Sequence, residues 1–192
     1  MGKWIYRLKI TLMESKPSIW RRILVEEDVL LSDLHKIIQT TMGWTNSHLH
    51  HFIKDDAFYT ERMPNDDFWE EMNNVDYKGM RLNQLLPFVK NTVVYEYDFG
   101  DGWDHEVLLE KFIKVDESLK YPICIAGSMN CPPEDIGGIM GYCEMLKVLR
   151  NPNNEEYESY ISWLGGEFDY KEFDIDKINK KLAKRNFGIL QY

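Results

Sequence analysis

Cysteine is scarce in this sequence: 192 residues contain three, Cys124, Cys131 and Cys143, an odd number without paired spacing. This excludes the disulfide framework typical of small secreted domains. No apolar run approaches the roughly 18 residues that a membrane helix needs. The chain also opens with a strand-like pattern instead of a charged-then-apolar leader. We therefore expect a reduced, cytoplasmic protein without membrane contact.

Positive charge is scarce as well. The chain has 23 Lys and Arg against 32 Asp and Glu, which gives a formal net charge of -9. Surfaces that bind nucleic acid draw affinity from clustered Lys and Arg that release counterions from phosphates. The composition therefore argues against nucleic acid as a partner and leaves an unidentified protein or small molecule.

Established catalytic signatures are missing too. The sequence has no phosphate-binding G-x-x-x-x-G-K-[ST] loop, no G-x-S-x-G elbow and no H-E-x-x-H helix. Asp98-Phe99-Gly100 matches a kinase tripeptide, but the other kinase motifs are absent. No repeat or low-complexity linker divides the chain, so we expect one domain over residues 1–192. Whether it is an enzyme stays open on this evidence.

The order of apolar patterns predicts an α+β fold with a mostly antiparallel sheet. Period-two alternation predicts strands, and apolar residues at helical spacing between Leu31 and Met42 predict a helix, capped by Ser32 or Asp33 and ended at Gly43. The predicted strands cover residues 4–12, 19–25, 48–53, 92–99 and 105–115. The strand-strand-helix opening is typical of several folds, among them the ubiquitin-like grasp.

Two other regions are less regular. Residues 54–78, with Pro64 to Asp67 at their centre, are polar and favour a short hairpin or a mobile loop. After Pro122 the composition changes to helices over 138–150, 155–164 and 175–185, which we expect to pack as a layer on the sheet.

Histidines supply the first candidate chemistry. If residues 48–53 are extended, His48 and His50 project from the same face because side chains alternate along a strand. Two imidazoles on one face can hold a divalent metal such as zinc, and His105 would join them if its strand folds back alongside. The alternative is that these histidines are hydrogen-bonded or face solvent. For His35, on the first helix, a satisfied and partly buried side chain is expected.

Carboxylates and glycines concentrate in two segments. The segment YDFGDGWDHEV contains Asp98, Asp101 and Asp104, which can act as metal ligands or supply a general base, for which Asp101 is the candidate. The alternative is that these aspartates are present because a tight turn requires them. In CPPEDIGGIMGY, Glu134 and Asp135 can form an acid/base pair or cap the following helix.

Two tryptophans, Trp44 and Trp103, each follow a glycine beside these polar groups, and we expect them to line a groove.

Six motifs carry a resemblance to a known family: PSIWRRI, LHKIIQTTMGW, HLHHF, YDFGDGWDHEV, CPPEDIGG and WLGGEFD. On these the chain resembles the plasmid pRiA4b ORF-3-like proteins, over nearly its whole length. The resemblance implies a single α+β domain without an established activity, although some members carry plasmid or recombinase labels. Members often have a cysteine just after the PPED segment, where this chain has Ile136, so a cysteine-based metal site there is in doubt.

Three hypotheses of function follow. The first is a non-catalytic binding or adaptor module, because the acidic, aromatic-rich domain lacks a catalytic signature. The second is a metal-dependent hydrolase with His48, His50 and His105 as ligands and Asp101 or Glu134 as base. The third, a nucleic-acid-associated plasmid or recombination factor centred on Arg21 and Arg22, rests on the family labels alone.

Overall fold

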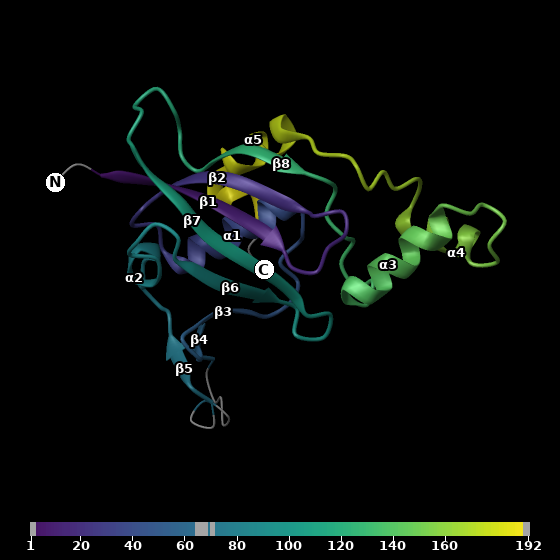
Figure 1. Cartoon of the computed structure of the whole chain (residues 1–192), viewed down its shortest axis with the longest axis horizontal. Coiled ribbons are helices and arrows are strands. Elements are labelled where there is room, and N and C mark those ends of the chain that lie inside the picture. The colour runs from purple at the N-terminus through teal and green to yellow at the C-terminus, as the bar shows by residue number, and fades with distance from the viewer. Residues whose placement is uncertain (1–2, 64–68, 70–71, 190–192) are drawn as a thin grey trace.

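The centre of the molecule is an eight-stranded sheet with the strand order β5-β4-β3-β6-β7-β1-β2-β8 (Figure 1). The computed structural model describes residues 3–63, 69 and 72–189. Neighbouring strands are antiparallel, except that β4 and β5 are parallel. The strands are β1 (Trp4–Leu12), β2 (Trp20–Glu26), β3 (His50–Lys54), β4 (Ala57–Thr60), β5 (Asn74–Asp76), β6 (Thr92–Tyr97), β7 (Trp103–Lys114) and β8 (Ile123–Ser128).

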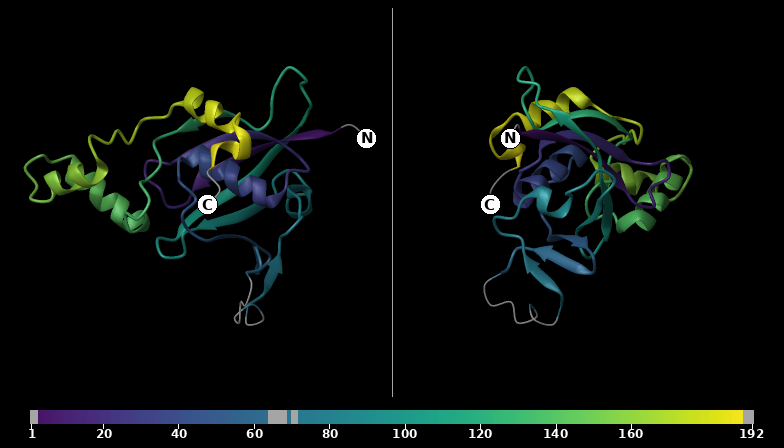
Figure 2. Two further views of the ribbon diagram at one scale, coloured as in Figure 1. Left: turned by 180° about the vertical axis from the view of Figure 1, so that it is seen from behind. Right: turned by 60° about the vertical axis from the view of Figure 1, so that its left-hand side comes forward.

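One face of this sheet is covered by α1 and α5, as the view from behind shows (Figure 2). The helices are α1 (Leu31–Met42), α2 (Leu82–Leu85), α3 (Gly138–Leu149), α4 (Tyr157–Leu164) and α5 (Ile175–Leu182), followed by a 3-10 turn, η2 (Arg185–Gly188). Sheet and helices confirm the α+β class. No helix in the described part of the chain is both long enough and apolar enough to cross a membrane.

The core lies between α1 and the sheet. Alternation in β1 turns Leu8, Ile10 and Leu12 inward, where each is buried. Helical spacing turns Leu34 and Ile38 of α1 toward them. The predicted helix 31–42 is confirmed, including its end at Gly43, whose φ of +102° suits glycine. The predicted cap is wrong, because α1 begins after Leu30 and no side chain caps it.

Two features of the strands differ from the sequence prediction, and the short hairpin expected in the polar region is present. A strand, β8, follows Pro122 where only helices were expected, and it pairs with β2. The third strand begins at His50, so His48 lies in the bend before it. The polar region after β3 contains β4, which forms a hairpin with β3, and β5. The expected turn at residues 64–67 lies outside the described residues.

Helices α3 and α4 extend from one end of the sheet and do not form the layer expected on its face (Figures 1 and 2). No residue of α4 is buried, whereas α3 contributes Tyr142, Met145 and Leu146 to the core. Of the three late helices, α5 packs against α1 and β8.

The outer edge of β8 is closed by a side chain. The Asn179 side chain, on α5, accepts a hydrogen bond from the backbone N–H of Cys124 at 2.8 Å and donates one to the backbone oxygen of Cys124 at 2.9 Å. One amide group thus satisfies both backbone groups that the next strand of a sheet would use.

Candidate functional site

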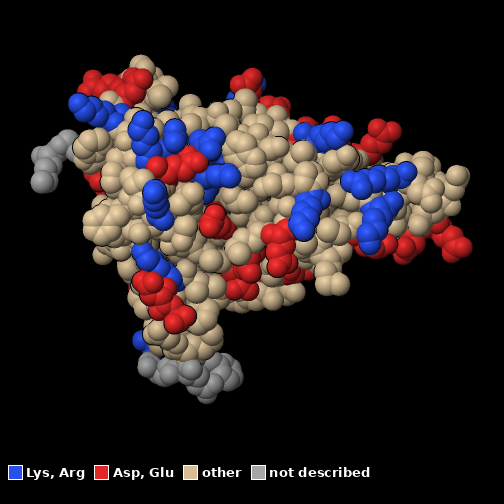
Figure 3. All heavy atoms as spheres, in the orientation of Figure 1, with Lys and Arg blue, Asp and Glu red and all other residues tan. Residues whose placement is uncertain are grey.

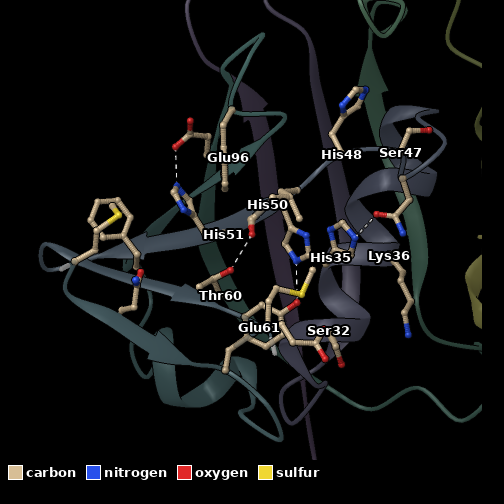
Figure 4. A pocket seen from close by; sticks show the side chains of 18 residues that line it. Ser32, His35, Lys36, Ser47, His48, His50, His51, Thr60, Glu61 and Glu96 are labelled. Atoms are coloured by element: carbon tan, nitrogen blue, oxygen red, sulfur yellow. Dashed lines mark hydrogen bonds and ion pairs between the residues drawn. The ribbon is translucent and has the colours of Figure 1, made fainter. Parts of the chain in front are cut away.

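A cavity of about 960 Å³ opens beside the first half of α1 (Figure 4). One part of its wall comes from α1 and from the segment that precedes β3. The rest comes from β3, β4 and the region of β5, together with Glu96 of β6 and Phe99 of the turn that follows β6. The lining is mixed: histidines, hydroxyl groups and charged side chains alternate with methionine and phenylalanine. Its volume lies within the range of about 300 to 1,000 Å³ that is usual for ligand sites.

Two of these histidines, His35 and His50, stack on each other. Their ring centroids are 3.4 Å apart, and the ring planes differ by 3°. His35 Nε2 donates to Asn46 Oδ1 at 2.6 Å, and His50 Nε2 hydrogen-bonds the Tyr77 hydroxyl at 2.9 Å. Burial lowers the pKa of His35 to about 4, and burial together with the neighbouring His35 lowers the pKa of His50 well below its ordinary value. Both rings are therefore neutral at neutral pH.

The stack is held by Tyr95, which is completely buried. His35 Nδ1 accepts a hydrogen bond from the Tyr95 hydroxyl at 2.8 Å, since the other ring nitrogen is the donor to Asn46. The same hydroxyl accepts from Gln39 Nε2 at 2.9 Å, and Gln39 Oε1 accepts from the backbone N–H of Asn46 at 3.1 Å. This closed network fixes the orientation of the His35 ring, on which His50 stacks, and it confirms the satisfied, partly buried His35 expected from the sequence.

The cavity rim is apolar and partly acidic. Leu49, Met63, Met72 and Phe99 line it, and each is about half exposed, between 49% and 57%. His51 Nε2 donates to Glu96 Oε2 at 2.6 Å, so that carboxylate is already engaged. Within the described residues, no hydrogen bond or ion pair engages the carboxylate of Glu61, which also lines the cavity.

A compact group of possible metal ligands lies at one side of the cavity. His48 Nε2 is 3.6 Å from Asp98 Oδ2 and 3.2 Å from Asp135 Oδ1, and the three ligand atoms all lie within 4.8 Å of one another. We refer to His48, Asp98 and Asp135 as the His-Asp-Asp cluster. Figure 4 shows His48 apart from the stacked pair of His35 and His50.

Within this cluster, the His48 Nε2 atom is buried and has no hydrogen-bond partner in the described structure. Asp98 is only 8% exposed. Its Oδ1 atom accepts hydrogen bonds from the backbone N–H groups of Gly100 at 3.1 Å and Asp101 at 3.4 Å, which leaves Oδ2 directed at His48. Asp135 is exposed and completes the cluster, with its Oδ1 atom 3.2 Å from His48 Nε2.

Glu134 holds the loop that carries Asp135. Its Oε1 atom accepts a hydrogen bond from the Tyr97 hydroxyl at 2.6 Å, and its Oε2 atom accepts from the hydroxyl and backbone N–H of Thr45 at 2.6 and 3.1 Å. Burial and the Glu134 carboxylate raise the pKa of Tyr97. Both carboxylate oxygens of Glu134 are therefore occupied.

The loop that carries Glu134 and Asp135 packs closely against the turn after β6, which contains Asp101. Asp101 Oδ2 accepts a hydrogen bond from the backbone N–H of Gly137 at 3.1 Å. A Cβ atom on Gly138 would lie 2.3 Å from the backbone oxygen of Asp101, so only glycine permits this approach. Three of the motifs singled out in the sequence, around Trp44 to His48, Asp98 to Asp101 and Cys131 to Gly138, thus meet at one place.

The structure separates the remaining predicted ligands from this cluster. His50 stacks on His35, and the Asp101 carboxylate holds the loop. His105 has no exposed surface; its Nδ1 atom donates to the Tyr95 backbone oxygen at 3.2 Å, and burial lowers its pKa to about 4. Among the described residues, the three whose ligand atoms lie close enough together to hold a metal are His48, Asp98 and Asp135. Of the predicted ligands this group keeps His48, and it does not contain His50, His105 or Asp101.

Two further expectations need correction. Neither Glu134 nor Asp135 caps α3, which begins after Gly137 without a side-chain cap. Trp103 is completely buried and lines no groove, because it packs under Trp44 in the core. Trp44 itself borders a second cavity of about 370 Å³, and its Nε1 atom donates to the backbone oxygen of Pro132 at 2.9 Å.

The two arginines proposed for nucleic-acid contact are both engaged. Arg21 is 2% exposed and donates hydrogen bonds to the backbone oxygens of Thr41 and Ser128. Lys and Arg side chains do gather over β1, β2 and β7 (Figure 3). There, however, Glu110 accepts two hydrogen bonds from Arg22, at 2.7 and 2.8 Å, and pairs with Arg7 at 2.9 Å.

Comparison with known proteins gives a consistent set of relatives. The model of the plasmid pRiA4b ORF-3-like protein family matches residues 4–177. An uncharacterized protein of Sinorhizobium fredii, y4hQ, is 34% identical over 181 residues, which cover 92% of this chain and 89% of that protein. The crystal structure of a protein of unknown function from Methanosarcina mazei Go1, MM3350, is 39% identical, with a TM-score of 0.80; the match covers 91% of this chain and 97% of that one.

Proposed function

The chain belongs to the plasmid pRiA4b ORF-3-like protein family, and we propose that it acts as a binding module whose ligand occupies the cavity beside α1. The observation that carries this proposal is the construction of the cavity. Its wall contains a stacked pair of neutral imidazoles, one held by a closed hydrogen-bond network and the other by Tyr77, and four half-exposed apolar side chains border it. A rigid, partly apolar site of this size lowers the entropy cost of holding a small molecule.

The charges of the lining select the ligand class. The Glu96 carboxylate is paired with His51, and Lys36 with Asp33, whereas Glu61 contributes a carboxylate without such a partner in the described structure. A ligand with an apolar or aromatic body and one cationic amine matches this lining. A carboxylate ligand would instead meet the like charge of Glu61.

A thermal-shift screen of aromatic amines against carboxylates of the same shape tests this proposal. We expect the amines to raise the melting temperature and the carboxylates to leave it unchanged. Glu61→Gln should remove the preference for amines, and the matched control Glu117→Gln, on an exposed loop, should keep it. Equal binding of both classes, or of neither, would refute the proposed ligand.

Metal-dependent hydrolysis is the second candidate function, favoured by the position of the His-Asp-Asp cluster at the side of the cavity. Hydrogen-bond donors already engage both oxygens of Glu134 and one oxygen of Asp101, which favours a zinc-bound water over either carboxylate as the source of the nucleophile. The test is a screen of chromogenic esters and phosphoesters with zinc and with chelator. Turnover that needs zinc and disappears in Asp135→Asn would support it, and its absence for all substrates would count against it.

A further inference from the structure

We propose that His48, Asp98 and Asp135 form a binding site for one zinc ion. The site would exist whether or not the cavity binds an amine, because none of the three residues belongs to the histidine stack or to the apolar rim that hold the proposed ligand. One imidazole nitrogen and two carboxylate oxygens are donors that zinc accepts in proteins.

The distances between the ligand atoms fit a tetrahedral ion. Zinc lies roughly 2.0 to 2.2 Å from nitrogen and oxygen ligands, so two ligands of a tetrahedron are roughly 3.3 to 3.6 Å apart. His48 Nε2 is 3.6 Å from Asp98 Oδ2 and 3.2 Å from Asp135 Oδ1. These separations are close to the two tetrahedral edges that meet at the histidine, and the third edge, between the two carboxylate oxygens, is at most 4.8 Å.

The His48 nitrogen supplies a second, independent argument. Its Nε2 atom is buried and makes no hydrogen bond in the described structure, which is a costly state for a polar atom. An ion between this nitrogen and the two carboxylates would give it a partner. It would also neutralise the two negative charges that the fold places side by side.

The surroundings hold the ligands in this arrangement. The N–H groups of Gly100 and Asp101 orient the Asp98 carboxylate so that one oxygen remains free. Glu134, bound by Tyr97 and Thr45, fixes the loop that brings Asp135 to His48. Metal sites in proteins show outer contacts of this kind, which orient the coordinating groups.

Three protein ligands leave a fourth tetrahedral position unfilled by the chain. His48 also lines the cavity, so the site lies at the cavity wall. Zinc sites with three protein ligands use the fourth position for water or for a ligand.

The test is a calorimetric titration of chelator-treated protein with zinc chloride, with metal content measured after dialysis. We expect one zinc per chain, and at least a tenfold loss of affinity in both Asp135→Asn and His48→Gln. The matched controls Asp176→Asn, on α5, and His51→Gln should bind zinc as the unaltered protein does. Because Asp135 is exposed, its variant keeps the fold and decides the question if His48→Gln does not fold.

Two results would overturn the site: no zinc binding by the unaltered protein, or zinc binding by Asp135→Asn and His48→Gln that is as tight as that of the unaltered protein. The outcome is separable from the proposed amine binding. Glu61→Gln should bind zinc normally, and Asp135→Asn should still bind the aromatic amine, so failure of one proposal does not imply failure of the other.

Discussion

Acid should unfold this protein through its buried histidines, and His105 allows the effect to be isolated. The ring of His105 has no exposed surface, and burial lowers its pKa from 6.5 to about 4. The folded chain therefore binds fewer protons than the unfolded chain between these two values. Stability is complete above about pH 6.5, falls as the pH decreases toward about 4, and changes no further from this residue below that.

The size of the effect follows from the same pKa values. At about pH 5, a histidine with a folded pKa near 4 and an unfolded pKa near 6.5 costs about 2 kcal/mol of stability. His35, whose pKa is also lowered to about 4, adds a similar amount, and His50 acts in the same direction. Together the first two cost about 4 kcal/mol, a large part of the roughly 5 to 15 kcal/mol that stabilises a typical domain.

The assay is urea unfolding at about pH 7.5 and about pH 5, for the unaltered protein and for His105→Phe, which keeps an aromatic ring but cannot be protonated. We expect the difference in unfolding free energy between the two pH values to shrink by about 2 kcal/mol in the variant. The control Ile23→Val removes a buried methyl group and should lower stability equally at both pH values. An unchanged pH difference in His105→Phe would refute the reasoning.

Three further predictions concern the loop and the thiols. Gly138→Ala should lower the unfolding free energy, measured by urea unfolding, by at least about 1 kcal/mol more than the control Gly79→Ala. Both glycines have a positive φ, but of the two only Gly138 would bring a Cβ atom against backbone atoms. Tyr97→Phe should cost about 1 to 3 kcal/mol in the same assay, because the Glu134 carboxylate loses its hydroxyl donor. A thiol reagent should modify one of the three cysteines rapidly, the partly exposed Cys143, and the two buried ones only in urea; two fast thiols would contradict the described burial.

The elements that local pattern controls were predictable. Alternation along Trp4–Leu12 and helical spacing along Leu31–Met42 depend on one buried face each, and both elements form with the predicted bounds. Strand β8 was missed because ICIAGS is short and does not alternate, and its pairing with β2 is a contact between distant parts of the chain. Patterns within one segment do not record such pairings.

The candidate site shows the same limit. The sequence identified the segments around His48, Asp98 and Asp135, but not the combination that meets in space. His50 was assigned to the metal because it alternates with His48; in the fold the chain bends before β3, and His50 stacks on His35 of α1. Asp135 reaches His48 only because its loop packs on the turn at Asp101, a contact that glycine at position 138 permits and that spacing alone does not predict.

The amide of Asn179 has a consequence for how this protein behaves at high concentration. A sheet grows by adding strands at its edges, and an unprotected edge recruits strands from other molecules into aggregates. At β8 the Asn179 side chain occupies the backbone groups of Cys124 that an incoming strand would need, and the opposite edge strand, β5, is only three residues long. Replacing Asn179 with leucine would leave both backbone groups of Cys124 without this partner, so this single residue of α5 helps to prevent intermolecular strand pairing.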